Sequence, residues 1–161
     1  MARTFNKILV PTDFSEPSHA ALNCARELVQ AFGGSLHVIH VLEDSELRGV
    51  VGEGYIGPSP TLPQREGLME QAARDQLERL FDETDRKRLD THLGVVTGDP
   101  VHEILWYAQQ HDIDLVVMGT HGRTGIAHVL LGSVAEHVVR KSVCPVLTMH
   151  GVRQPVAARL A

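Results

Sequence analysis

Asp114-Leu-Val-Val-Met-Gly119 is an aliphatic run with almost no polar residue between its ends. A strand that lacks polar alternation is typical of a parallel sheet whose two faces are both covered by helices. Lys7-Ile-Leu-Val-Pro11 has the same character and ends in the turn residues Thr12 and Asp13. Both runs therefore predict short buried strands.

Helices and strands alternate along the rest of the chain. Further strands are expected at 35–42, 92–97 and 145–149, and helices at 15–32, 66–87, from 99 onward and from 132 onward. Strands that alternate with helices need crossover connections, so the predicted class is α/β with a five-stranded parallel sheet and helices on both faces. Residues 43–65, rich in glycine and proline, are expected to form a long flexible loop.

Composition limits the range of functions. The 161 residues carry a formal net charge of -5, so no overall positive field is available to bind nucleic acid or an anionic membrane. No apolar run approaches the length of a membrane span or of a signal sequence, which predicts a cytoplasmic protein. Cys24 and Cys144 lie in no metal-binding spacing and are expected to be reduced core residues.

The residues that follow Met118 are the main candidates for binding a ligand. Gly119 and Gly122 are separated by two residues, and nine more residues lead to Gly132-Ser133 at the start of a predicted helix. Gly119 would let a ligand approach the strand end, and Gly122 would let main-chain N–H groups turn inward. The helix start adds unpaired N–H donors and the positive end of the helix dipole. This pattern predicts an anion site, although the glycines could instead only build a tight turn.

The chain resembles the universal stress proteins from Lys7 to Met149. The resemblance rests on Ile8-Leu-Val-Pro-Thr-Asp-Phe-Ser15, Leu36-His-Val-Ile-His-Val41, Asp114-Leu-Val-Val-Met-Gly-Thr-His-Gly-Arg123, Leu131-Gly-Ser-Val134 and Cys144-Pro-Val-Leu147. The glycine pattern is similar to that of the subgroup that binds ATP. The resemblance implies strand order 3-2-1-4-5 in an adenine nucleotide alpha hydrolase-like, Rossmann-like three-layer sandwich. It also implies a domain over 1–150 with the insert at 43–65, followed by a tail at 151–161.

The resemblance also implies a set of ligand contacts. The triphosphate would lie on Gly119, Gly122, Gly132, Ser133 and Val134, with Met118 and Arg123 close by. Pro11, Thr12 and Asp13 would line the ribose and adenine, and Val41 would pack on the base. The cofactor would be ATP, with or without Mg²⁺. A homodimer through the last strand, Val146 to Met149, is implied in the same way.

Several other motifs are weaker. Gly52-Glu-Gly-Tyr-Ile-Gly57 matches a dinucleotide fingerprint but does not lie between a strand and the helix that it opens. The chain contains no GxxxxGK[ST], GxSxG or HExxH motif, so neither catalytic residues nor metal ligands are predicted. His37 and His40 are three apart on a strand and should point to opposite faces. Asp13 could contact the ligand, bind Mg²⁺ or cap the first helix, and ligand contact is preferred.

The expected function is that of an ATP-binding stress-response or regulatory factor that acts as a dimer. It is not expected to be an enzyme beyond slow ATP hydrolysis, because no catalytic base is evident. Two alternatives stay open at this point: a nucleotide-using enzyme of the same α/β group, and a structural dimer without a ligand.

Overall fold

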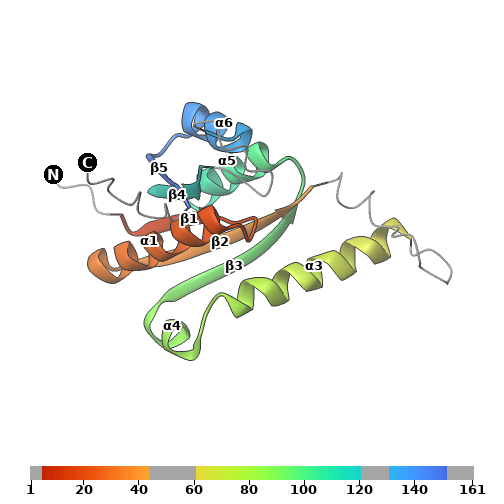
Figure 1. Ribbon diagram of the computed structural model, residues 1–161, viewed down its shortest axis with the longest axis horizontal. Coiled ribbons are helices and arrows are strands. Elements are labelled where there is room, and N and C mark those ends of the chain that lie inside the picture. The colour runs from red at the N-terminus through yellow and green to blue at the C-terminus, as the bar shows by residue number, and fades with distance from the viewer. Residues whose placement is uncertain (1–4, 44–60, 121–130, 152–161) are drawn as a thin grey trace, which may run out of the picture.

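A parallel sheet forms the centre of the molecule. In this computed structural model, residues 5–43, 61–120 and 131–151 are described. Within them, β1 (Lys7–Pro11), β2 (Ser35–Leu42), β3 (Asp90–Thr97), β4 (Leu115–Gly119) and β5 (Val146–Met149) form a sheet of order β3-β2-β1-β4-β5. All four neighbouring pairs are parallel (Figure 1). The predicted fold class and strand order are therefore confirmed.

Helices cover both faces of the sheet. Ile8 and Val10 of β1 belong to an apolar cluster with α1 (Glu16–Phe32) and α3 (Leu62–Arg79). Leu9, between them, belongs to a second cluster with α5 (Pro100–Gln110) and α6 (Ser133–Lys141). Successive residues of a strand point to opposite faces, so this division defines three layers. None of the described helices has the length and apolar character that crossing a membrane requires. The cytoplasmic location stays a prediction.

The helix predicted at 66–87 is in fact two helices, α3 and the short α4 (Glu83–Arg88). α3 begins at Leu62 because the Gln64 side chain accepts a hydrogen bond from the Thr61 N–H at 2.9 Å, which satisfies one N–H that the helix cannot. Asp82 caps α4 by accepting from the Asp85 N–H at 2.8 Å. The predicted loop at 43–65 is therefore wrong for 62–65, and residues 44–60 lie outside the described part of the chain.

The turn between α1 and β2 brings the second strand against the first. α1 stops at Gly33, as predicted. The Gly33 N–H donates to the Val29 carbonyl at 2.8 Å. Gly34 has φ +109°, and a Cβ there would lie 2.1 Å from the Asn6 carbonyl oxygen. Only glycine fits this conformation and this close approach. The next residue, Ser35, donates its N–H to the same oxygen at 2.8 Å and starts β2 beside β1.

Candidate functional site

The carboxyl ends of three strands meet at one edge of the sheet. β1 lies between β2 and β4, and the Thr12 N–H donates to the Ile39 carbonyl at 2.8 Å just past the end of β1. Ligands of open α/β sheets bind beyond this edge, where neighbouring connections diverge to opposite faces. The residues predicted to contact the ligand from these strands therefore lie together: Pro11, Thr12, Asp13, Val41, Met118 and Gly119.

The start of α6 is fixed at the same edge. The Gly132 N–H donates to the Thr120 carbonyl at 2.6 Å, which ties the helix to the residue that follows β4. Gly132 is the N-cap, so Ser133 and Val134 occupy the first turn, where N–H groups have no acceptor within the helix. Val134, Val41 and Met118 belong to one apolar cluster. Two predicted contacts, Gly122 and Arg123, lie outside the described residues, as does His121.

The loop after β1 is held by its own side chains. The Thr12 hydroxyl lies 3.0 Å from the Ser18 hydroxyl and accepts a hydrogen bond from the Phe14 N–H at 3.1 Å. Asp13 accepts from the N–H and the hydroxyl of Ser15, at 3.1 and 2.5 Å. Because Ser15 is the N-cap residue of α1, the Asp13 carboxylate helps to organise the start of that helix. The cap position itself belongs to Ser15, and contact of Asp13 with a ligand stays a prediction.

Sequence reasoning missed the part that His40 plays at this edge. His40 is 5% exposed, and its Nδ1 lies 2.8 Å from the Thr12 carbonyl oxygen. Its ring also stacks at a tilt on Phe14, with the centroids 4.7 Å apart. The sequence signal was a pair of histidines, His37 and His40, in a largely aliphatic run, and that signal did not identify the partner of either.

Glycine is required at position 119 for a different reason from the one that the sequence suggested. We expected its missing side chain to make room for a ligand. A Cβ at this position would instead lie 2.9 Å from the Pro17 carbonyl carbon and 3.0 Å from the Ser18 nitrogen. The first turn of α1 therefore fills that space, and packing alone requires glycine here. Any contact with a ligand would have to use the main chain of Gly119.

Replacing Gly119 should destabilise the fold without any ligand present. Gly119→Ala is expected to lower the free energy of unfolding by about 1–3 kcal/mol, because the backbone of α1 must move. Urea unfolding of the apoprotein measures the change. Gly94→Ala in β3 is the matched control, since a Cβ there meets only Ile39 Cγ2 at an ordinary 3.6 Å. Equal stability of the two variants would contradict this account of Gly119.

A cluster of aromatic and imidazole rings lies near the opposite, amino end of the strands. His37 and His40 point to opposite faces, as predicted: His37 Nδ1 lies 3.0 Å from the Tyr107 hydroxyl of α5. His37 also stacks on His92 at 4.5 Å. Burial, followed by the neighbouring charges of His92, His111 and Lys7, lowers the pKa of His37 to about 4.

The described residues contain no group of three or more His, Cys, Asp or Glu placed to hold a metal ion.

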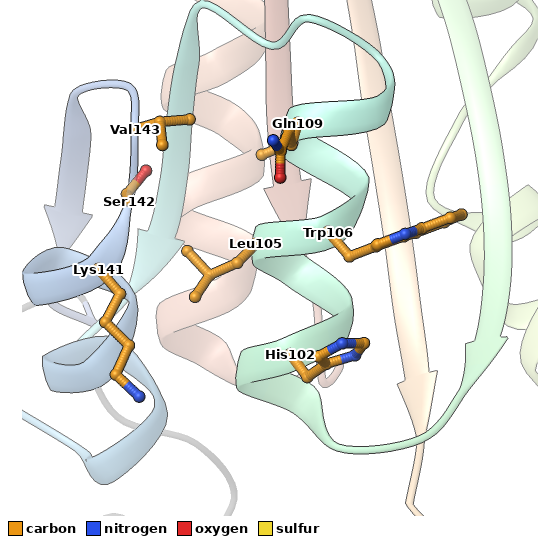
Figure 2. A pocket seen from close by; sticks show the side chains of 8 residues that line it. His102, Leu105, Trp106, Gln109, Lys141, Ser142 and Val143 are labelled. Carbon is orange, nitrogen blue, oxygen red and sulfur yellow. The ribbon is translucent and has the colours of Figure 1, made fainter.

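A groove of about 230 Å³ lies between α5 and the end of α6. Figure 2 shows Leu105 pointing from α5 toward α6, with Lys141, Ser142 and Val143 on the other side. None of the residues predicted to bind a nucleotide lines this groove. Cys144 is the next residue along the chain after Val143. Cys24 and Cys144 form no disulfide, and both are half-buried, whereas the sequence predicted core positions.

The comparisons with known proteins agree with this architecture. The chain matches the model of the Universal stress protein family over residues 4–150. Universal stress protein MJ0531 of Methanocaldococcus jannaschii is 34% identical over 145 residues, which cover 90% of this chain and 82% of that protein. The solved structure of MJ0577, from the same organism, matches with a TM-score of 0.80 at 28% identity and covers 94% of this chain and 99% of its own.

A universal stress protein from Archaeoglobus fulgidus, solved in complex with dAMP, shares the fold at 21% identity and a TM-score of 0.60, with 91% of this chain and 98% of that one covered. The family match spans nearly all of the chain, and the sheet has the order that the sequence resemblance implied. This chain therefore belongs to the universal stress protein family.

Proposed function

We propose that this protein binds ATP at the edge where the ends of β1, β2 and β4 meet the first turn of α6. The observation that carries the proposal is the hydrogen bond from the Gly132 N–H to the Thr120 carbonyl. It holds a helix N-terminus, capped by a residue without a side chain, directly beside the strand ends. A helix N-terminus in this position favours a phosphate group through its N–H donors and its dipole.

The proposed site has a phosphate side and a nucleoside side. On the phosphate side, the main-chain N–H groups of Gly119, Gly122, Ser133 and Val134 and the Ser133 hydroxyl would donate to phosphate oxygens, with the Arg123 guanidinium adding charge. The Gly132 N–H is bonded to the Thr120 carbonyl, so Gly132 would contribute only the close approach that its missing side chain allows. The members of that side are Gly119, Gly122, Arg123, Gly132, Ser133 and Val134. On the nucleoside side, Pro11, Thr12 and Asp13 would contact the sugar and base, and the half-buried Val41 would pack against the base. Met118 is 5% exposed, so its contribution would be an apolar floor.

Different observations support the choice of an adenine nucleotide and the choice of a triphosphate. The relative solved with dAMP has this fold and a ligand that shares adenine and the first phosphate with ATP. The longer triphosphate is supported by the spacing of Gly119, Gly122 and Gly132-Ser133, which provides donors over more than one phosphate. We infer a regulatory role in which nucleotide occupancy alters dimer or partner contacts, accompanied at most by slow hydrolysis.

The test is direct. Nucleotide released from the purified protein is identified by mass spectrometry, and ATP is then titrated into the apoprotein by calorimetry with and without Mg²⁺. We expect co-purified adenine nucleotide and saturable binding of ATP. A protein that carries no nucleotide and gives no binding heat would refute the proposal and favour a structural dimer. Fast turnover with a second substrate would instead indicate an enzyme.

We also propose that β5 pairs with β5 of a second copy. β5 lies at the edge of the sheet, and Leu147 on it is 38% exposed. The carbonyls of Pro145 and Met149 accept hydrogen bonds from the β4 side. Because strand residues alternate in the direction of their main-chain groups, Val146 and Thr148 present theirs to the open edge. Such an unpaired edge is a template for pairing with another strand.

Thr148→Pro should dissociate this dimer. Proline removes the N–H that faces the open edge but leaves the bonds between β4 and β5 in place. We expect the dimer dissociation constant to rise by at least about tenfold, the effect of losing one or two main-chain hydrogen bonds. Light scattering after size exclusion measures it, and Thr148→Val, which keeps the N–H, is the matched control. A wild-type protein that is monomeric at all concentrations would rule the dimer out.

A further inference from the structure

The Thr12 main chain is fixed at both ends by neighbouring residues of β2. Its N–H donates to the Ile39 carbonyl at 2.8 Å, and its carbonyl lies 2.8 Å from His40 Nδ1. A carbonyl oxygen can only accept, so His40 Nδ1 carries the proton and donates. Thr12 is therefore held to β2 by one main-chain bond and by one side-chain bond, and the side-chain bond can be removed without changing the backbone of the loop.

His40 also supports the residue on the far side of Asp13. Phe14 has φ +63°, in the left-handed region that bulky residues avoid. Its N–H is bonded to the Thr12 hydroxyl at 3.1 Å, and its ring packs on the His40 ring at 4.7 Å. One buried imidazole thus contacts the residues that precede and follow Asp13. This arrangement leaves the loop from Thr12 to Phe14 few alternative conformations.

A purely structural role explains the choice of histidine poorly. β2 is otherwise buried with mostly aliphatic side chains on this face, and an aliphatic residue at position 40 would pack without the cost of burying a polar ring. The imidazole provides what an aliphatic side chain cannot: a donor aimed at the Thr12 carbonyl. Within the described residues, the His40 side chain donates its hydrogen bond to Thr12 and packs its ring on Phe14, so both contacts are made with the Thr12–Phe14 loop.

We propose that His40 is a positioning residue that fixes the Thr12–Phe14 loop in the conformation that receives the nucleoside part of the ligand. This inference rests on the proposed function, since Pro11, Thr12 and Asp13 form the nucleoside side of the proposed site. His40 acts through the loop. It therefore affects every nucleotide that carries the same nucleoside, whatever the number of phosphates.

Two variants separate the two contacts of His40. His40→Phe keeps a ring against Phe14 but removes the donor, and His40→Asn places an amide N–H close to the position of Nδ1 but removes the ring. His37→Asn is the control, because it changes a buried histidine of the same strand that faces α5 and does not touch the loop. Circular dichroism and urea unfolding establish that each variant is folded at the temperature of the binding measurements.

The affinities for ATP, ADP and AMP give the decisive readout. We expect His40→Phe to weaken all three by the same factor, about tenfold, the usual effect of one lost hydrogen bond. His40→Asn should recover most of that loss, and His37→Asn should leave all three affinities unchanged. If the wild type binds and His40→Phe binds equally well, the inference fails while the proposed function stands. If the wild type binds none of them, the proposed function itself has failed.

Amide exchange in the apoprotein tests the loop without any ligand. The Phe14 N–H, which is bonded to the Thr12 hydroxyl, should exchange about tenfold faster in His40→Phe than in the wild type. Exchange at Leu9, in the centre of the sheet, should not change, because it reports the core. Unchanged protection of Phe14 would show that the loop does not depend on His40 and would overturn the inference.

Discussion

Gly132→Val is expected to weaken ATP binding by at least about 100-fold, which corresponds to roughly 2.7 kcal/mol of binding free energy. Gly132 has φ -68° and ψ 159°, values open to every residue, so its backbone conformation alone does not require glycine. A β-branched side chain at the N-cap would place carbon atoms beside the first-turn N–H groups of Ser133 and Val134. Phosphate oxygens could then no longer reach those donors.

The stability of the variant must be measured separately, because valine is a poor N-cap residue and should cost about 1 kcal/mol of folding free energy. Gly67→Val in α3 is the matched control: nothing lies within 4 Å of a Cβ at that position. It introduces the same side chain at an exposed helix position that is not among the proposed ligand contacts, and it should leave the affinity for ATP unchanged. The loss in Gly132→Val should be larger for ATP than for AMP, since AMP has fewer phosphate oxygens to hold. Wild-type affinity in Gly132→Val would exclude the first turn of α6 from the site.

Much of the fold was predictable because it depends on local signals. The aliphatic runs gave β1 and β4 to within one residue, and Asp99-Pro100 correctly marked the start of α5, where Asp99 accepts from the His102 N–H at 2.8 Å. The break between α3 and α4 was not predicted. It depends on the cap formed by Asp82, and residues 82–88 are all polar or charged, so no apolar spacing marks where one helix ends and the next begins. The strand order came from the family resemblance, because right-handed crossovers permit more than one order.

The location of the site was predictable from the sequence, but the contacts that hold its residues in place were less so. Strands β1, β2 and β4 had to end at one edge because all of them are parallel. The contact of Gly119 with Pro17 joins residues that are far apart in the sequence, and nothing local to Gly119 announces it. His40 and Thr12 are 28 residues apart, and their hydrogen bond depends on the register between β1 and β2. Contacts of this kind appear only when the chain is folded.

The ring cluster around His37 should make the stability of the protein depend on pH. His37 is 5% exposed and is surrounded by His92 and Asp90 of β3, Tyr107 of α5, His111 just after α5, and Lys7 of β1. Its pKa is about 4 in the folded protein, against an ordinary value of 6.5. Between these values the unfolded chain binds a proton at this position and the folded chain does not. The free energy of unfolding therefore falls as the pH is lowered through this window.

We expect this single group to remove about 3 kcal/mol of stability between about pH 7.5 and about pH 4. Other groups also titrate in this range, so the measurement is a difference: urea unfolding is followed across the range for the wild type and for His37→Asn. The variant should be less stable at neutral pH, because it loses the ring stack on His92, but its stability should fall less steeply on acidification. His19→Asn, an exposed position on α1, should keep the wild-type slope. Parallel pH profiles for the wild type and His37→Asn would show that the buried imidazole is not the group responsible, because the loss would then arise from carboxylates or exposed histidines elsewhere.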